Sequence, residues 1–174
     1  MNSRPLRVEV RRILLERMAE QGLGNYRVLA DYQPTSQGRE QNAVYFFEVS
    51  DNRSGWQGRS YTTPTDESDG QRHERQTMQT VMQFGAFVDK DRDITAKDLL
   101  NNVALIINSL GFILDASKEN IGVQRVTDIR TPYFKNESDR FEMSPSFDVT
   151  FSYTRTLNQS QEFTDAVPED VHSI

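Results

Sequence analysis

Three aspartates at alternating positions are the residues in this sequence whose spacing comes nearest to a metal-binding loop. Asp89, Asp91 and Asp93 match the first, third and fifth positions of a calcium loop, where oxygen ligands surround a hard cation. The sixth position is Ile94 instead of glycine, and the twelfth is Leu100 instead of a bidentate glutamate. The same acids also suit a loop before a helix, because they favour the positive end of the helix dipole. We therefore predict neither a metal site nor a cofactor.

His73 and Glu74 are adjacent groups that could act as an acid and a base. Neighbouring residues of a strand point to opposite faces, so the two side chains would not act on one substrate unless the chain twists. The sequence has no glycine-rich phosphate loop, nucleophile elbow or paired-histidine metal motif. It has no cysteine, which excludes thiolate chemistry and suits assembly in a reducing cytoplasm. We expect no catalytic residue and do not expect an enzyme.

Length and charge limit the classes of protein further. A chain of 174 residues fits one compact domain plus appendages. Its net charge of −6 argues against a DNA-binding protein held by phosphate contacts. Arginines scattered through residues 1–20 leave no apolar run of signal-peptide length, and no other stretch reaches the ~20 apolar residues that span a bilayer. We expect a soluble protein without a membrane partner.

Two segments have the periodicity of amphipathic helices. Residues 4–21 repeat apolar side chains at helical spacing, and their second stripe, of arginines, reads as a solvated face in preference to a docking surface. Thr95 and Asp98 form a capping box, so a helix is predicted to begin there, run to Leu110 and end at Gly111. The apolar stripe of this second helix supplies the candidate core residues Leu99, Val103, Ile106 and Leu110.

Strand patterns are expected at residues 26–32, 43–50, 76–88, 123–131 and 141–157. In the last segment apolar side chains fill the odd positions, interrupted at Arg155. Its ~17 residues would extend ~56 Å, whereas a compact chain of this length is ~40 Å across. The segment must therefore bend at Pro145 or project from the body. Phe147 and Phe151 are candidate core residues that we expect to pack on the helix of residues 95–110.

The stretch 51–75 has no sustained period and reads as a long loop or hairpin. It contains Trp56 and Tyr61, which either anchor an interface or fold back on the sheet. The strand at 43–50 carries large side chains on both faces, so it is either covered on each side or meets another protein through one face. The candidate interface residues are Trp56, Tyr61, Phe46 and Arg155.

Together these elements predict an α+β fold, with a mixed, mostly antiparallel sheet and two main helices packed on one face. Residues 1–157 are expected to form a single domain in which 51–75 is a long loop or hairpin insertion. Residues 158–174 are polar, and acidic near Glu169 and Asp170. We expect them to form a C-terminal tail that is either disordered or ordered only against a neighbour.

Three stretches carry a resemblance to a known family. The strand Gln83–Val88, the helix Thr95–Leu110 and the run from Ile121 to Tyr153 resemble the bacteriophage tail terminator, or neck terminator, family. The resemblance covers residues 76–157, rests on hydrophobic patterns and does not include 51–75. It implies an α+β subunit that assembles as a homo-oligomeric ring, usually a hexamer, at the head-proximal end of the tail tube.

The resemblance also implies a function, partners and a location. The ring would cap the tail tube, stop its polymerisation and give the head a joining platform. Expected partners are further copies of the chain, the tail tube protein and a head-completion or connector protein, with the tail sheath as a further candidate. DNA would slide through the lumen without specific binding, which suits an acidic subunit. The protein would be assembled in the host cytoplasm and located in the virion, at the tail and neck.

Three other interpretations stay open at this point. The chain could be another ring component of the tail or neck, such as a tube, baseplate or head-completion protein, because pattern alone separates these roles poorly. It could be a metal-dependent hydrolase that uses Asp89, Asp91, Asp93 and His73. It could also be a small host-interaction module anchored by Trp56 and Tyr61.

Overall fold

The computed structural model of the chain describes residues 3–30, 41–62, 70–135 and 141–161. Its helices are α1 (Ser3–Glu20), α2 (Ala96–Ile107) and α3 (Leu110–Lys118). Its strands are β1 (Arg27–Ala30), β2 (Ala43–Thr62), β3 (Gly70–Phe87), β4 (Ile121–Val126), β5 (Tyr133–Lys135), β6 (Phe141–Met143) and β7 (Ser146–Gln161). The predicted α+β class is confirmed, with α3 as an additional helix.

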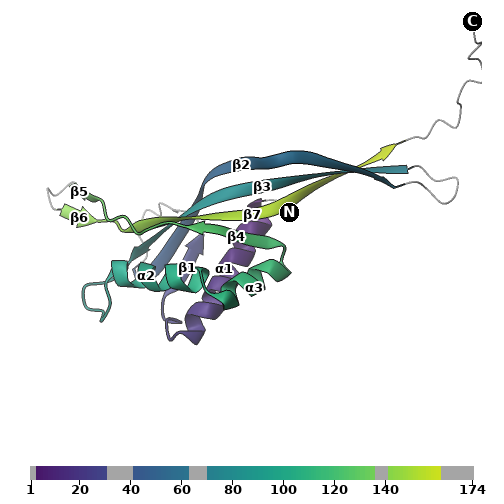
Figure 1. Cartoon of the computed structure of the whole chain (residues 1–174). Coiled ribbons are helices and arrows are strands. Elements are labelled where there is room, and N and C mark those ends of the chain that lie inside the picture. Colours follow the sequence, from purple (N-terminus) through teal and green to yellow (C-terminus); the bar gives the residue numbers. More distant parts are fainter. Residues whose placement is uncertain (1–2, 31–40, 63–69, 136–140, 162–174) are drawn as a thin grey trace, which may run out of the picture.

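The sheet and the helices form two layers, and all three helices cover the same face of the sheet (Figure 1). The strand order is β1-β2-β3-β7-β4, with β1 parallel to β2 and the remaining neighbours antiparallel. Phe46, Phe84 and Phe147 lie side by side on the three central strands, with centroid distances of 5.3 Å between successive rings. Together with side chains from the helices they form one core cluster.

Helix α1 packs on the sheet through five fully buried side chains. They are Leu6, Val10, Ile13, Leu14 and Met18. The arginine stripe that the sequence placed in solvent also binds the sheet. Arg11 Nε donates to the carbonyl of Val28 at 2.7 Å, and Arg7 pairs with Glu48 of β2 at 3.4 Å. The two arginines therefore fix the helix to the sheet, while Arg11 stays exposed and Arg7 partly exposed to solvent.

Helix α2 begins at the capping box that the sequence indicates. The Asp98 N–H donates to Thr95 Oγ1 at 3.2 Å, and the Thr95 N–H donates to Asp98 Oδ2 at 3.0 Å. Two N–H groups that the first helical turn leaves without partners are thereby satisfied. Leu99, Val103 and Ile106 then point into the core.

The helix predicted to run to Leu110 is two helices. Ser109 accepts a hydrogen bond from the Phe112 N–H at 3.3 Å and begins α3, at a bend of 58° from α2. Leu110 is therefore 71% exposed, so its assignment to the core is wrong, and Gly111 lies inside α3 instead of ending a helix. Among the described residues no single helix is long and apolar enough to cross a membrane, although the bent pair α2 and α3 passes that test of length and composition together.

The stretch 51–75 is a hairpin and not a loop. β2 continues to Thr62 and β3 starts at Gly70, while residues 63–69 lie outside the described part. The register of the two strands shifts between Glu48 and Ser50, and again between Ser54 and Gly58. Each bulge interrupts the alternation of faces, which explains why the sequence shows no sustained period there.

The segment predicted as one ribbon at 141–157 is divided. β6 ends at Met143, and β7 runs from Ser146 past residue 157 to Gln161, so the chain both breaks near Pro145 and projects from the body (Figure 1). Phe147 and Phe151 are fully buried in the core cluster, as expected. Of the predicted C-terminal tail, residues 162–174 lie outside the described part.

Candidate functional site

Three strands continue beyond the helices as an arm, which we define as residues 53–62 of β2, 70–77 of β3 and 154–161 of β7 (Figure 1). β1 pairs only with residues 43–46 of β2, and β4 only with residues 149–153 of β7. In the arm, β3 is thus the central strand, and no described strand pairs with the outer edges of β2 and β7. The 20 residues of β2 extend ~66 Å at ~3.3 Å each, well beyond the ~40 Å of a compact body.

A buried carboxylate lies in the middle of the arm. Glu74 is 8% exposed and forms ion pairs with Arg72 and, at 3.7 Å, with Arg59. Gln57 also donates its amide N–H to Glu74. A buried carboxylate needs partners of this kind, because losing its hydration is costly. The network therefore holds β2 and β3 together where no apolar core is present.

His73 has a structural environment on the other face of the arm. Its Nε2 lies 3.0 Å from Thr62 Oγ1 and its Nδ1 2.8 Å from Asn158 Oδ1. Both ring nitrogens are thus engaged with neighbouring strands. Glu74 points to the opposite face, as expected for adjacent strand residues, so the two do not form an acid–base pair.

The three aspartates that resembled a calcium loop lie at the far end of β3 from His73. Asp89 accepts a hydrogen bond from Asn42 Nδ2 at 3.0 Å, which ties the loop to the start of β2. No group of three or more His, Cys, Asp or Glu side chains among the described residues is placed to hold a metal ion. About 14 residues of extended strand, or ~45 Å, separate His73 from this loop, so the residues of the hydrolase interpretation are not brought together.

Trp56 is displayed on a bulge at the edge of the arm. Its side chain is 99% exposed, whereas large aromatic side chains are usually buried to a substantial degree. Gly55 has φ = +71°, a left-handed conformation that glycine adopts without strain, and it lies within the register shift between Ser54 and Gly58. Gln76 Nε2 donates to the Ser54 carbonyl at 2.9 Å and anchors the bulge to β3. The conformation of Gly55 and the hydrogen bond from Gln76 therefore fix the backbone that carries the exposed Trp56 side chain.

The other candidate interface residues have different positions. Tyr61 is 58% exposed, and Arg155 is exposed on β7 of the arm. Phe46 is fully buried and stacks on Phe84, so its assignment to an interface is wrong. The sequence also missed Leu157, which is 52% exposed on the arm. The alternation of apolar residues at odd positions contained that signal, but it did not show where the helices stop covering the strand.

The chain matches the family model described as E217 gateway protein gp29 over residues 6–163, which include the body and the whole arm. The chain belongs to this family. Membership of the gateway protein family indicates that the chain is a phage structural protein of the neck, the region that connects head and tail. It is therefore a virion component. No curated protein matches the chain.

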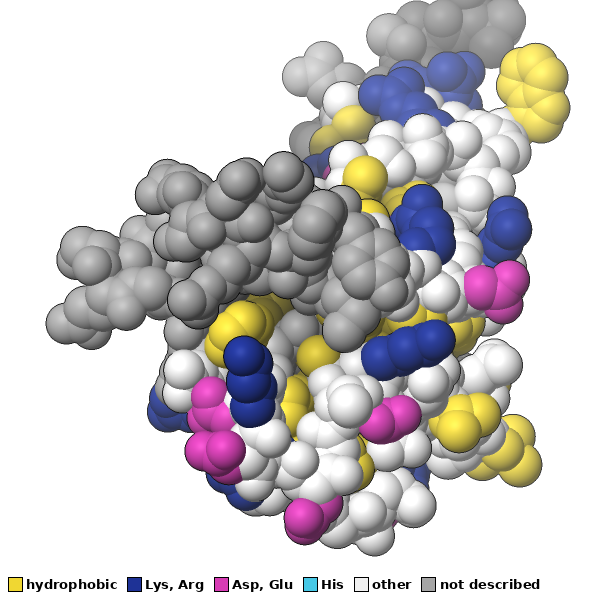
Figure 2. Space-filling model, turned by 90° about the vertical axis from the view of Figure 1, so that its left-hand side faces the viewer, with side chains coloured by type: hydrophobic (Ala, Val, Ile, Leu, Met, Phe, Trp, Pro, Cys, Tyr) yellow, Lys and Arg dark blue, Asp and Glu magenta, His cyan; other side chains and the backbone are white. Residues whose placement is uncertain are grey.

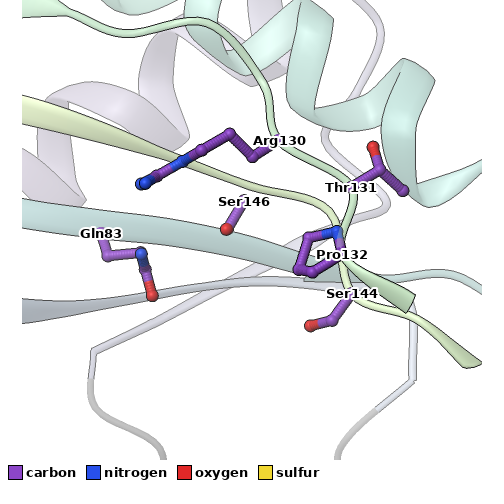
Figure 3. Close-up of a pocket in the computed structure, with 6 residues that line it drawn as sticks. All are labelled: Gln83, Arg130, Thr131, Pro132, Ser144 and Ser146. Atoms are coloured by element: carbon purple, nitrogen blue, oxygen red, sulfur yellow. The ribbon is translucent and has the colours of Figure 1, made fainter. Parts of the chain in front are cut away.

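In this gateway family member the face of the sheet opposite the helices carries a hollow of about 550 Å³, and most of its described lining residues are of polar types. Figure 3 shows Gln83 and Arg130 on its sides, and its remaining lining residues are Thr131, Pro132, Ser144 and Ser146. Gln83 and Arg130 both bond to Asp148, with Gln83 Nε2 donating at 3.0 Å. None of the described lining residues is an Asp, Glu, His or Cys, and the carboxylate of Asp148 beside them is engaged by Gln83 and Arg130.

Among the described residues that face the viewer in Figure 2, charged and polar side chains are interspersed with separate apolar ones. Helices α2 and α3 also carry three exposed leucines. They are Leu105, Leu110 and Leu114.

Proposed function

We propose that this chain is a tail terminator of the phage neck, a subunit whose ring caps the tail tube, stops its polymerisation and provides the platform for head joining. The observation that carries the proposal is the arm: three strands that extend beyond a body with its own core and display Trp56 at an edge. A chain in a neck family with such an extension is suited to hold neighbouring subunits together.

The arm supports assembly into a ring. A projecting element that contacts a different surface on the next copy forms a heterologous interface, and such interfaces generate closed rings when the rotation closes. The open edges of β2 and β7 offer backbone N–H and C=O groups for pairing with a further strand. Trp56 adds an aromatic anchor of the kind that dominates interface energetics. A hexamer is the ring number implied by the resemblance to the tail terminator family.

Termination follows from two unlike ring surfaces. One face of the sheet is covered by helices, whereas the other presents the polar side chains around the hollow at Gln83 and Arg130. A ring that binds the growing tube with one surface and presents a different surface on the other side does not propagate the polymer. The second surface would receive the head-completion or connector protein, and the sheath is a further candidate partner.

The proposed function involves no bond making or breaking and no cofactor, so we propose a structural protein and not an enzyme. DNA passes through the ring lumen, and the chain's net charge of −6 limits retention of the DNA through phosphate contacts.

The direct test is deletion of the gene and complementation with variants. Without the protein, tails are expected to exceed their normal length and to lack heads; complementation with the wild-type chain restores both. The Trp56→Ala variant should fail to restore them, whereas Leu105→Ala, a change at a similarly exposed apolar residue of the body, should restore them. Tails of normal length joined to heads in the deletion strain would overturn the proposal.

The description of the family as a gateway protein favours one second candidate, a connector ring that joins head and tube without ending tube growth. The same deletion separates the two functions. Tails of normal length without heads would support the connector, and elongated tails would support the terminator.

A further inference from the structure

We propose that the face of the sheet opposite the helices lines the lumen of the ring, from residue 50 to the end of the arm, and meets the DNA that passes through it (Figure 1). This inference rests on the proposed function and names the surface of the chain that faces DNA. It follows from the strand register, from the side chains that this register places on the face, and from the contrast with the other face of the arm.

The strand register shows which residues share this face. Met78 and Met82 of β3 are buried under the helices, so the residues at odd positions of β3 point away from the helices. Each of them is opposite one residue of β2 and one of β7, which makes six rows of three residues. We call these eighteen residues the neutral face. Its residues on β3 are Gln71, His73, Arg75, Thr77, Gln79 and Val81.

The neutral face is almost free of charge. Its residues on β2 and β7 are serine, threonine and asparagine, with one glycine. Charged residues make up 26% of the chain, but Arg75 is the single one among the eighteen residues of the neutral face. Asp148, two residues before Thr150 of this face, is engaged by Gln83 and Arg130 at the hollow. The neutral face therefore presents hydroxyl and amide groups where other surfaces of the chain present ions.

The segments that follow the arm strands in the sequence do not add positive charge. Residues 63–69, which join β2 to β3, contain Asp66, Glu67 and Asp69, and residues 162–174 contain four further acidic residues. Neither segment contains lysine or arginine. The neutral face thus has no excess of cations, either of its own or from these two segments. Such an excess would retain DNA through phosphate contacts.

The two faces of the arm differ in what they can bind. Five of the six charged residues of the arm lie on its helix-side face, and Arg75 is the sixth. Tyr61 and Leu157 lie on the helix-side face as well, and both are more than half exposed. Serine and threonine, which prevail on the neutral face, are under-represented among the residues that dominate protein interfaces. The helix-side face therefore suits contacts with proteins, and the neutral face does not.

A ring held together through the edges of the arms turns one face of each arm towards the lumen. That face has to let DNA move, so it needs neither cations that hold phosphates nor carboxylates that repel them. Hydroxyl and amide groups exchange their hydrogen bonds with water at little net cost, and they leave DNA mobile. Gln71 to Val81 extend ~36 Å at ~3.3 Å per residue, about one turn of B-DNA. Each arm would therefore face phosphates of both strands.

Photo-crosslinking during infection tests this surface directly. The deletion strain is complemented with the full chain carrying benzoylphenylalanine in place of Gln79, and the virions are irradiated while their DNA enters the host. Mass spectrometry of the purified, digested DNA should then find crosslinked peptides that contain position 79. The matched controls carry the photo-reactive group in place of Tyr61 on the helix-side face or of Val8, which is 56% exposed on α1. Their yields should be several-fold lower. If the variant at position 79 does not assemble, Ser152, opposite Gln79 on β7, takes its place.

Added cations test the same surface by their effect on DNA movement. Gln79→Lys with Thr156→Lys puts two new charges per copy on the neutral face and should slow DNA release from purified virions about tenfold, because each lysine can contact a phosphate. Raising the salt from about 0.05 to 0.2 M should weaken each contact roughly threefold and restore the rate. Val8→Lys with Leu105→Lys, two exposed positions of the helix layer, is the matched control and should leave the rate unchanged. A DNA-binding dye measures the release, which is triggered with host envelope material.

The outcomes separate this inference from the proposed function. Equal crosslink yields at positions 79, 61 and 8, or equal slowing by the two pairs of lysines, would overturn the inference. Electron microscopy of the same virions reports tail length and head joining independently. Normal virions without a crosslink at position 79 would place the neutral face outside the lumen and leave the terminator proposal intact. A crosslink at position 79, together with tails of normal length in the deletion strain, would support the inference and contradict termination.

Discussion

The body and the arm are built from the same three strands but differ in the side chains on their helix-side face. In the body, successive positions of this face on β3 are Met82 and Phe84, both fully buried under the helices. In the arm, the corresponding positions of the same strand are Arg72 and Glu74, which form an ion pair. The alternation of faces continues without interruption along β3, and only the chemistry of the side chains changes where the helices end.

This difference separates folding from assembly. The body is stabilised by burial of apolar surface, at roughly 25 cal/mol per Å², and therefore does not depend on a partner. The arm has no such layer and relies on strand pairing and on the Glu74 network. Because the arm has no apolar layer of its own, its aromatic and charged side chains stay exposed. They are therefore available for contacts with other subunits.

The largest effect should come from a cavity in the body. Phe147→Ala removes a ring that stacks on Phe84 at 5.3 Å, and should lower the free energy of unfolding by about 3 to 5 kcal/mol. Leu157→Ala, ten residues along the same strand but in the arm, should change it by less than about 0.5 kcal/mol. Denaturant titration measures both. Equal losses for the two variants would show that the arm is packed against something within the monomer.

Replacing Trp56 should weaken assembly but leave the stability of the monomer unchanged. The Trp56→Ala variant should keep the melting temperature of the wild type, because its side chain makes little contact within the monomer. It should weaken subunit association by about 2 kcal/mol or more, the range for a buried aromatic anchor of an interface. Sedimentation over a concentration series measures this change. An unchanged association constant would remove Trp56 from the interface.

The sequence predicts only part of the fold of the body and the arm. The capping box of Thr95 and Asp98 and the odd-position pattern around Phe147 are local signals, so the start of α2 and the buried face of β7 could be predicted from sequence. The bend at Ser109 could not, because the apolar stripe continues through Leu110 and only packing decides which side of the break is covered. The assignment of Phe46 to an interface was wrong for the same reason, because a strand that is apolar on both faces does not reveal which face is covered.

The candidate site was harder to predict than the fold. Trp56 and Tyr61 could be singled out as aromatics in a polar stretch, but whether they are exposed or fold back on the sheet could not be decided. The helix-side face of the arm could not be predicted, because Arg53, Arg72 and Arg155 are far apart in the sequence and only the strand register places them on one face. The register shift between Glu48 and Ser50 adds one residue to β2, so counting alternate residues onward from Phe46 would have placed Arg53 and Arg59 on the wrong face.

An intermediate effect on stability is expected at Glu74. Glu74→Gln keeps the shape of the side chain but removes the charge that balances Arg72 and Arg59. We expect a loss of about 2 kcal/mol, the scale of hydrogen bonds to charged groups. Hydrogen exchange should show the loss as faster exchange in the arm, with the amides of α2 unaffected. Uniform acceleration in body and arm would contradict the separation of the two regions.

The smallest effect should be a pH dependence of the body. Lys118 and Arg17 lower the pKa of Asp115 below its ordinary value of 3.8, because both stabilise the ionised carboxylate that links α3 to α1. A lowered pKa in the folded state stabilises the protein above pH 3.8, and this contribution is lost as the pH falls through the folded-state pKa. Wild type should therefore melt at a higher temperature than Asp115→Asn at pH 6, and the difference should shrink as the pH is lowered below 3.8. A difference that persists at low pH would contradict this assignment.

The separation of a folding body from an assembling arm is tested most directly by native mass spectrometry of the full chain with the tail tube protein. The wild-type chain is expected to give one closed multiple of its 20.1 kDa mass, alone or at the tube end. The Trp56→Ala variant should stay monomeric at the same concentration while melting at the wild-type temperature. A wild-type chain that is monomeric under both conditions, or a Trp56→Ala variant with the same subunit count as the wild type, would contradict the account.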